Sequence, residues 1–202
     1  MKLLLTSFFV CLWMMASGQN EREELLRSWD STVAATDEEF RDPDHSPLPQ
    51  EEIKNFKGLA YYFFDYAYVV KAKFEPTPDE KPFLMPTTTD RLPQYVKYGI
   101  LHFEIEGQSL ALSVYKNIDL SKKAGYENYF FIPFNDSTNG FETYGGGRYM
   151  DIQGPLGDTV ILDFNRAYNP YCAYNSRYSC PIPPPENRLH IRIEAGVLEW
   201  KH

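Results

Sequence analysis

The apolar pattern of this chain changes its period at Gly58, and that change limits the folds open to it. Before Gly58, residues 21–40 are typical of an amphipathic helix, with apolar side chains at helical spacing and acidic residues near the start, where the helix dipole favours them. After Gly58, apolar residues alternate with polar ones. The clearest case is a predicted hairpin of residues 95–105 and 110–115, joined by a turn at 106–109.

Further short apolar segments complete the predicted sheet. They lie at residues 68–74, 83–88, 129–134, 141–144, 148–152, 159–164 and 190–195. We expect 129–134 to pair with 141–144 through a turn at Asn139–Gly140, and 148–152 to pair with 159–164. Roughly eight short strands without intervening helices predict a mainly β fold, an antiparallel β-barrel or β-sandwich with an N-terminal α-helix.

The first residues are typical of a secretory signal peptide. Lys2 precedes an apolar run that ends at Met15 and is too short to span a bilayer, and small residues follow up to Gly18, which suits cleavage there. We therefore expect an exported protein, periplasmic or secreted, without a transmembrane anchor. The predicted parts are a signal peptide at 1–18, an N-terminal helical segment at 19–57, and an antiparallel β domain at 58–202.

Charge and motifs narrow the classes of function. The formal net charge is −8 and no basic tract is present, which argues against nucleic-acid binding. The sequence contains neither a nucleophile elbow nor the paired-histidine motif of zinc peptidases, so it predicts no cofactor and gives no positive sign of an enzyme.

Two cysteines, Cys172 and Cys180, remain once Cys11 is removed with the signal peptide. An even pair in an exported protein predicts a disulfide bond. A metal site is the weaker alternative, because zinc ligands within one loop usually lie about two to four residues apart and the next histidine is His190. Free thiols are the third alternative.

Two polar motifs form the candidate ligand site. Consecutive glycines at 145–147 precede Arg148, so backbone N–H groups and a guanidinium could hold an anion, although a bend in a strand is the alternative. Residues 163–178 are rich in tyrosine, asparagine and arginine, which suit either a pocket wall or a cover for the end of a barrel. The candidate ligand-binding residues are Glu142, Tyr144, Gly146, Arg148, Asp163, Asn165, Arg166, Tyr168, Asn169 and Tyr174.

Four stretches of the chain resemble a known family. They are Glu142–Tyr149, Asp163–Tyr174, Ser179–Pro181 and Pro184–Leu189, and the resemblance extends over about 56–196. The family is an uncharacterised bacterial one, known as domain of unknown function 1684. The resemblance implies a bacterial, exported protein, and it supplies no activity or ligand.

Three hypotheses of function follow. The first is a domain that binds a small ligand, with an anion as one option, through Arg148 and residues 165–178. The second is a structural or interaction module of the cell envelope, in which the cysteine segment serves stability alone. The third is a hydrolase that uses paired carboxylates drawn from Glu142, Asp151 and Asp163, and it requires two of them to lie within about 5–10 Å of each other in an open cleft.

Overall fold

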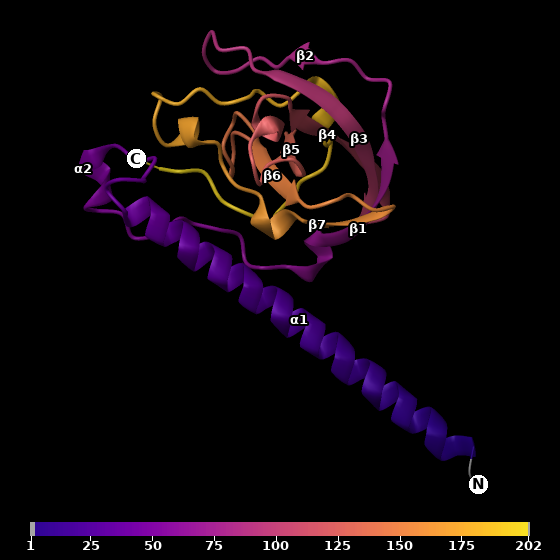
Figure 1. Cartoon of the computed structure of the whole chain (residues 1–202). Helices are drawn as coiled ribbons and strands as arrows, with labels where there is room; N and C mark the ends of the chain where they lie inside the picture. The colour runs from indigo at the N-terminus through magenta and orange to yellow at the C-terminus, as the bar shows by residue number, and fades with distance from the viewer. Residues whose placement is uncertain (1–2, 202) are drawn as a thin grey trace.

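The fold consists of one curled antiparallel sheet with a long helix beside it (Figure 1). The computed structural model describes the backbone of residues 3–201 and the side chains of residues 19–201. The helices are α1 (Leu3–Arg41) and α2 (Gln50–Ile53), and the strands are β1 (Val69–Pro76), β2 (Phe83–Leu84), β3 (Gln94–Ile105), β4 (Gln108–Asn117), β5 (Tyr129–Phe134), β6 (Arg148–Gln153) and β7 (Thr159–Asp163). The sheet order is β6-β5-β4-β3-β1-β7, with β2 paired to β3, so β6 and β7 are the two ends of an open half-barrel. The predicted class, mainly β with an N-terminal helix, is confirmed.

The predicted hairpin is the pair β3 and β4. Ile105 pairs with Gln108, which leaves a two-residue turn of Glu106 and Gly107, shorter than the four residues expected. Both turn residues have positive φ, 52° and 73°. Such a turn matches the right-handed twist of the strands, and this explains why the ladder continues to its very end.

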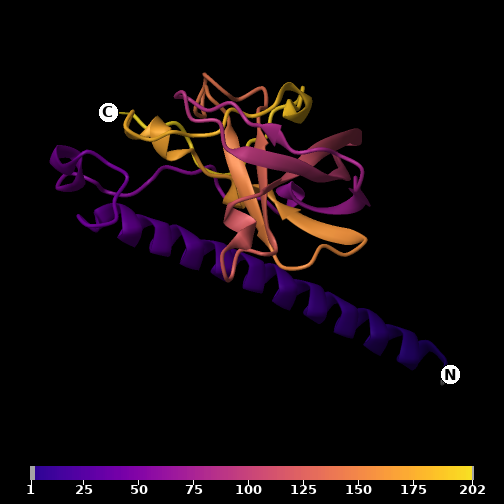
Figure 2. The same ribbon diagram turned by 45° about the horizontal axis from the view of Figure 1, so that its top comes forward.

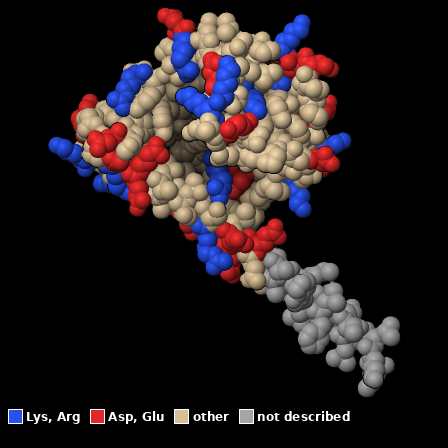
Figure 3. Space-filling view, in the orientation of Figure 1, with Lys and Arg blue, Asp and Glu red and all other residues tan. Residues whose placement is uncertain are grey.

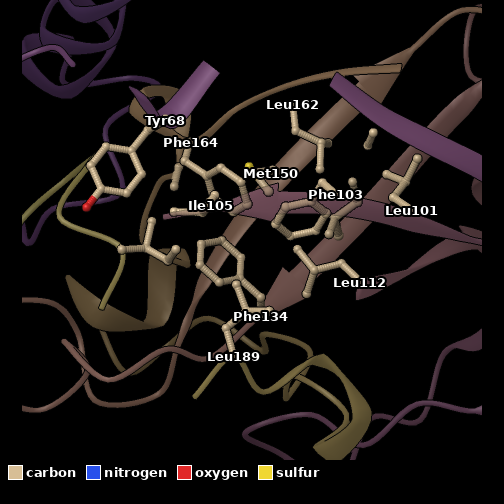
Figure 4. Packing of buried hydrophobic residues seen from close by; sticks show 14 of the residues in the cluster. Tyr68, Leu101, Phe103, Ile105, Leu112, Phe134, Met150, Leu162, Phe164 and Leu189 are labelled. Atoms are coloured by element: carbon tan, nitrogen blue, oxygen red, sulfur yellow. The ribbon is translucent and has the colours of Figure 1, made fainter. Parts of the chain in front are cut away.

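An irregularity in β3 gives the sheet two apolar faces. The register shifts between Lys97 and Gly99, where Tyr98 is the extra residue of a bulge. After the bulge, Leu101 and its partner Leu112 point into the curl and are fully buried in the main core. Figure 4 shows the side chains of this core packed together inside the curl.

Before the bulge, alternate side chains of β3 point to the outer face of the sheet. Tyr95 lies on this face, and neighbouring strands add Tyr115, Phe131 and Tyr149 to form a second apolar cluster. Cys180 packs against the same cluster. The outer face is therefore covered by a later part of the chain and is not left to solvent.

Residues 141–144 do not form the predicted strand, and β5 pairs with β6 instead. The connection before β6 is held in a compact turn by side chains. Asp136 Oδ1 accepts from the backbone N–H of Thr138 at 2.8 Å, and the hydroxyls of Thr138 and Thr143 lie 2.7 Å apart. These local bonds compete with strand pairing, so the ladder begins at the next apolar segment.

The predicted pairing of β6 with β7 is not formed, because the two strands lie at opposite ends of the sheet. The N–H of Gly154 donates to the carbonyl of Asn128 at 2.9 Å and so extends the contact with the β5 side. The chain then crosses to the other end of the sheet, where β7 pairs with β1. The glycines in this connection therefore mark a crossing between sheet ends, not a tight hairpin.

The last predicted strand, residues 190–195, is also absent. Ile191, Ile193 and Ala195 are buried in the main core, as the alternating pattern requires. However, the carbonyls of Ile193 and Ala195 accept hydrogen bonds from the Arg148 guanidinium. A buried side chain thus takes the place that a neighbouring strand would have at these two carbonyls, and the segment forms no strand, although the Ile191 carbonyl accepts from the N–H of Ser137 at 2.9 Å.

α1 lies along one side of the sheet domain, and Figure 2 shows the two side by side. It includes the predicted helix at 21–40, while the predicted signal peptide at 1–18 lies outside the residues whose side chains are described. The indole Nε1 of Trp29 donates to the carbonyl of Asn165 at 3.0 Å, which fixes the helix to the domain. Among the described residues, no helix is long and apolar enough to cross a membrane.

Candidate functional site

Arg148, the centre of the predicted anion site, is buried inside the domain. Its Nη2 lies 2.7 Å from Oδ2 of Asp136, and both side chains are fully buried. The guanidinium also donates to the carbonyls of Ile193, at 2.9 Å, and Ala195. Internal acceptors hold Nη1 and Nη2, and Nε is buried without a partner in the described residues. Because the whole side chain is closed off from solvent, the structure supports a structural role for Arg148 in place of the predicted ligand-binding one.

The triple glycine before Arg148 is a bend in the chain. Gly147 has a φ of 94°, and a Cβ there would lie 2.7 Å from the Phe134 carbonyl oxygen. A Cβ on Gly146 would lie 2.5 Å from the ring of Tyr144. Close packing accounts for Gly146, and close packing with an unusual dihedral angle accounts for Gly147, as the alternative interpretation proposed.

A cavity of about 550 Å³ lies between the outer face of the sheet, residues 165–181 and the C-terminal half of α1. Figure 3 shows the hollow in this face of the molecule, left of its centre. β3, β5 and β6 contribute its floor, and α1 contributes one wall through Trp29, Val33 and Phe40. Tyrosines dominate the rest of the lining, among them Tyr95, Tyr129, Tyr149, Tyr168, Tyr171, Tyr174 and Tyr178. The tyrosine-rich segment is therefore a cavity wall.

Asp151 on β6 is the acidic group at the floor of this cavity. Its Oδ2 accepts a hydrogen bond of 2.6 Å from the Tyr168 hydroxyl, and the Tyr129 hydroxyl bonds the same carboxylate. The side chain is exposed, since it lines both this cavity and a second pocket beside Asp163 and Arg166, but protein atoms surround its remaining sides. This burial raises the pKa of Asp151, and the two tyrosine bonds oppose it.

Both tyrosines remain hydrogen-bond donors at neutral pH. Burial raises the pKa of Tyr129 and of Tyr168, and the negative charge of Asp151 raises both further. The carboxylate and the two hydroxyls therefore form one connected group, whose members come from β5, β6 and the segment after η3 (Phe164–Arg166).

Asn165, Arg166, Asn169 and Tyr174 also line the cavity. Asn165 bonds the backbone of Asp65 in both directions at 2.9 Å. Arg166 ties the domain to α1 through Thr32 and Ser28. These two side chains position the walls, and their own polar atoms are already engaged.

Asn169 differs from these neighbours. It is 1% exposed, and its Nδ2 donates to the Leu198 carbonyl at 2.9 Å, which fixes the orientation of the amide. Its Oδ1 has no hydrogen-bond partner within the described part of the chain, although the Asn169 side chain lies close enough to the Tyr174 hydroxyl to lower the pKa of Tyr174. A buried amide oxygen without a partner is costly, so it calls for an explanation.

The other predicted residues lie away from the cavity. Glu142 is paired with Arg192 at 2.8 Å, and Asp163 with Arg166 at 3.2 Å. An arginine holds each of these two carboxylates, and neither lines the cavity. Asp151 and Asp163 do line a second pocket together, but Arg166 lies beside them there and holds the Asp163 carboxylate. The structure therefore does not offer the two available carboxylates that the hydrolase hypothesis needs.

Cys172 and Cys180 are free thiols in the structure, so the predicted disulfide is not formed there. They are nevertheless close, since the N–H of Cys172 donates to Sγ of Cys180 at 3.2 Å. A hydrogen bond from the Cys180 thiol lowers the pKa of Cys172 and raises that of Cys180. The Tyr144 hydroxyl lies 3.9 Å from Sγ of Cys172 and also lowers the pKa of Cys172.

Sequence reasoning found the tyrosine segment but missed the floor of the site. Tyr95, Tyr129 and Tyr149 belong to strands, so their pattern indicated only a half-buried sheet face. Asp151 entered only as a possible hydrolytic carboxylate. A usable signal was present, because Tyr149 and Asp151 alternate with the core residues Met150 and Ile152 and must face the opposite side.

The comparisons with known proteins agree with this fold. The chain is similar to an uncharacterised protein of Haloarcula marismortui, solved by solution NMR, with 32% identity, a TM-score of 0.69, and coverage of 89% of this chain and 96% of that one. That source is a haloarchaeon, so the bacterial origin implied by the resemblance is not established. Among curated proteins, none matches this chain. The chain belongs to the family described as "Protein of unknown function (DUF1684)", whose family model matches residues 54–198.

Proposed function

We propose that this protein binds a small organic ligand in the cavity between α1 and the outer face of the sheet. The observation that carries the proposal is the tyrosine-lined cavity with the Asp151 carboxylate at its floor. Its volume of about 550 Å³ is in the range of small-molecule sites. Tyrosine suits such a site because each ring offers a rigid apolar wall and a hydroxyl that orients a ligand.

The indole N–H of Trp29 provides a reporter for this cavity. Trp29 lines the cavity and donates to the Asn165 carbonyl, so a ligand there should shift its NMR signal. We expect fragments that bind, from a panel of small aromatic and aliphatic alcohols, amines and acids, to perturb this signal together with those of residues 165–181.

A pair of adjacent helix positions tests the location. Val33 lines the cavity, whereas Ala34, about 100° further round the helix, is exposed and does not line it. Val33→Trp places a large ring in the cavity and should weaken fragment binding by about tenfold, or 1.4 kcal/mol. Ala34→Trp adds the same ring outside and should leave affinity unchanged. Equal affinities in the two variants, or shifts confined to other surfaces, would contradict the proposal.

We also propose export, since residues 1–18 have the pattern of a cleavable signal peptide. In an oxidising compartment the thiols of Cys172 and Cys180 would form one S–S bond, with two electrons and two protons passing to an oxidised disulfide reagent. The hydrogen bond between the two thiols supports this pairing, because it makes the sulfurs neighbours, although they are not at bonding distance in the structure.

Mass spectrometry of the native protein checks both points. We expect a mature chain that begins near Gln19 and is lighter by two hydrogen atoms than the reduced form. After reduction, iodoacetamide at neutral pH should label Cys172 before Cys180, because only the pKa of Cys172 is lowered. An intact N-terminus would remove the export proposal, and thiols that remain free after export would remove the disulfide.

A further inference from the structure

We infer that the ligand is an organic ammonium compound, a cation with N–H donors on an apolar body. This inference rests on the proposed function and adds the chemical class of the ligand. Three features of the cavity carry it: an acidic group without a cationic partner, a buried acceptor without a donor, and aromatic walls.

The first feature is the isolation of Asp151. Two tyrosine hydroxyls donate to it, and no lysine, arginine or histidine pairs with it in residues 19–201. Arg166 lines the same cavity, but its guanidinium is engaged by Asp163, Thr32 and Ser28. The side chain is exposed, but the protein around it disfavours the charged form and raises the pKa of Asp151. A bound ammonium group would supply the missing charge.

The second feature is the amide oxygen of Asn169, which is buried and without a hydrogen-bond donor. Its amide nitrogen already donates to Leu198, so only the acceptor remains for a ligand. Asn169 lines the same cavity as Asp151, and the group that its buried oxygen lacks is a donor, which a ligand with N–H groups would bring.

The third feature is the aromatic lining, from Trp29 on α1 to Phe131 and Tyr149 on the sheet. Aromatic faces attract organic cations, and they also bury the apolar part of an amine. An anionic ligand would meet the charge of Asp151 and find no available cation. A neutral polyol could satisfy both acceptors but would leave the carboxylate uncompensated.

Three matched probes test the class on the full chain: 2-phenylethylamine as the ammonium, 2-phenylethanol as its neutral counterpart, and 3-phenylpropionate as the anion. Titrations followed by calorimetry and by the Trp29 N–H signal should show the amine binding at least about tenfold more tightly than the alcohol, since charge-assisted bonds are stronger. The carboxylate should bind more weakly than both.

Asp151→Asn keeps the size of the side chain and removes its charge. In this variant the affinity for the amine should fall to that for the alcohol, while the alcohol itself is little affected. Asp158→Asn, on the exposed connection after β6, is the control and should keep the preference. The ranking of probes on the unaltered chain remains decisive should Asp151→Asn fail to fold.

The outcomes separate this inference from the proposed function. If the alcohol or the carboxylate binds as tightly as the amine and shifts Trp29, the cavity binds ligands but the ammonium class is wrong. A preference for the amine that survives Asp151→Asn would also overturn the class. If none of the three probes binds, the ammonium inference fails, and the wider fragment panel then decides whether the cavity binds ligands at all.

Discussion

Replacing Arg148 by methionine should lower the free energy of unfolding by about 3–5 kcal/mol, the cost typical of breaking a buried ion pair from one side. The loss has a definite origin, because the variant leaves the carboxylate of Asp136 buried without its partner. It also leaves the carbonyls of Ile193 and Ala195 without the donor that replaces a strand. Urea unfolding followed by tryptophan fluorescence measures the change.

Arg192→Met is the matched control. Arg192 also lies 2.8 Å from a carboxylate, that of Glu142, but both side chains are solvent-exposed. Exposed pairs contribute little, so this variant should unfold at nearly the same urea concentration as the unaltered chain. Similar losses in the two variants would show that burial of the Arg148 pair does not determine its contribution.

Asn187→Leu is expected to have the second large effect, a loss of roughly 3–5 kcal/mol if each unpaired buried group costs about 1–3 kcal/mol. Asn187 is fully buried between β4 and β5. Its Oδ1 accepts from the N–H of Ser113 at 2.7 Å, and its Nδ2 donates to the carbonyls of Ser113 and Pro133 at 2.9 and 2.8 Å. Leucine has a similar size and can make none of these bonds.

The reason for this arrangement lies in the strands. Pro133 has no N–H, and β4 and β5 share only the pair of Tyr115 and Phe131. The amide of Asn187 therefore completes a ladder that the backbone leaves open. Hydrogen exchange at the Ser113 amide should become much faster in Asn187→Leu. The exposed Asn128→Leu is the control, and unchanged protection of Ser113 would refute the proposed bridging role.

These two side chains also explain how far the sequence predicts the fold. The helix at 21–40 and the β3–β4 hairpin could be predicted because local periodicity and a tight turn determine them. The partner of β5 could not be predicted, because side-chain bonds of the turn before β6 compete with strand pairing. The β4–β5 contact and the irregular segment 190–195 could not be predicted either, because Asn187 and Arg148 supply backbone partners from distant positions. Amino-acid patterns record where a polar side chain is, but not which backbone groups it will satisfy.

The candidate site was predictable in part for a similar reason. The composition of residues 163–178 indicated a polar, aromatic wall, and Asn165, Arg166, Tyr168, Asn169 and Tyr174 do line the cavity. Arg148 was assigned to a ligand because an arginine after three glycines resembles an exposed clamp. Only the burial of Asp136 beside it shows that its charge is neutralised internally.

The wall that α1 contributes has a consequence for the evolution of this family. The family model begins at residue 54, whereas Trp29, Val33 and Phe40 precede it. The acceptors Asp151 and Asn169 therefore lie within the residues that the family model matches, and the cavity wall formed by α1 lies outside them. Relatives that keep the floor and vary the helix would retain the same chemistry of recognition while admitting ligands of different shape. Selectivity could then diversify without any change to the core that holds the sheet together.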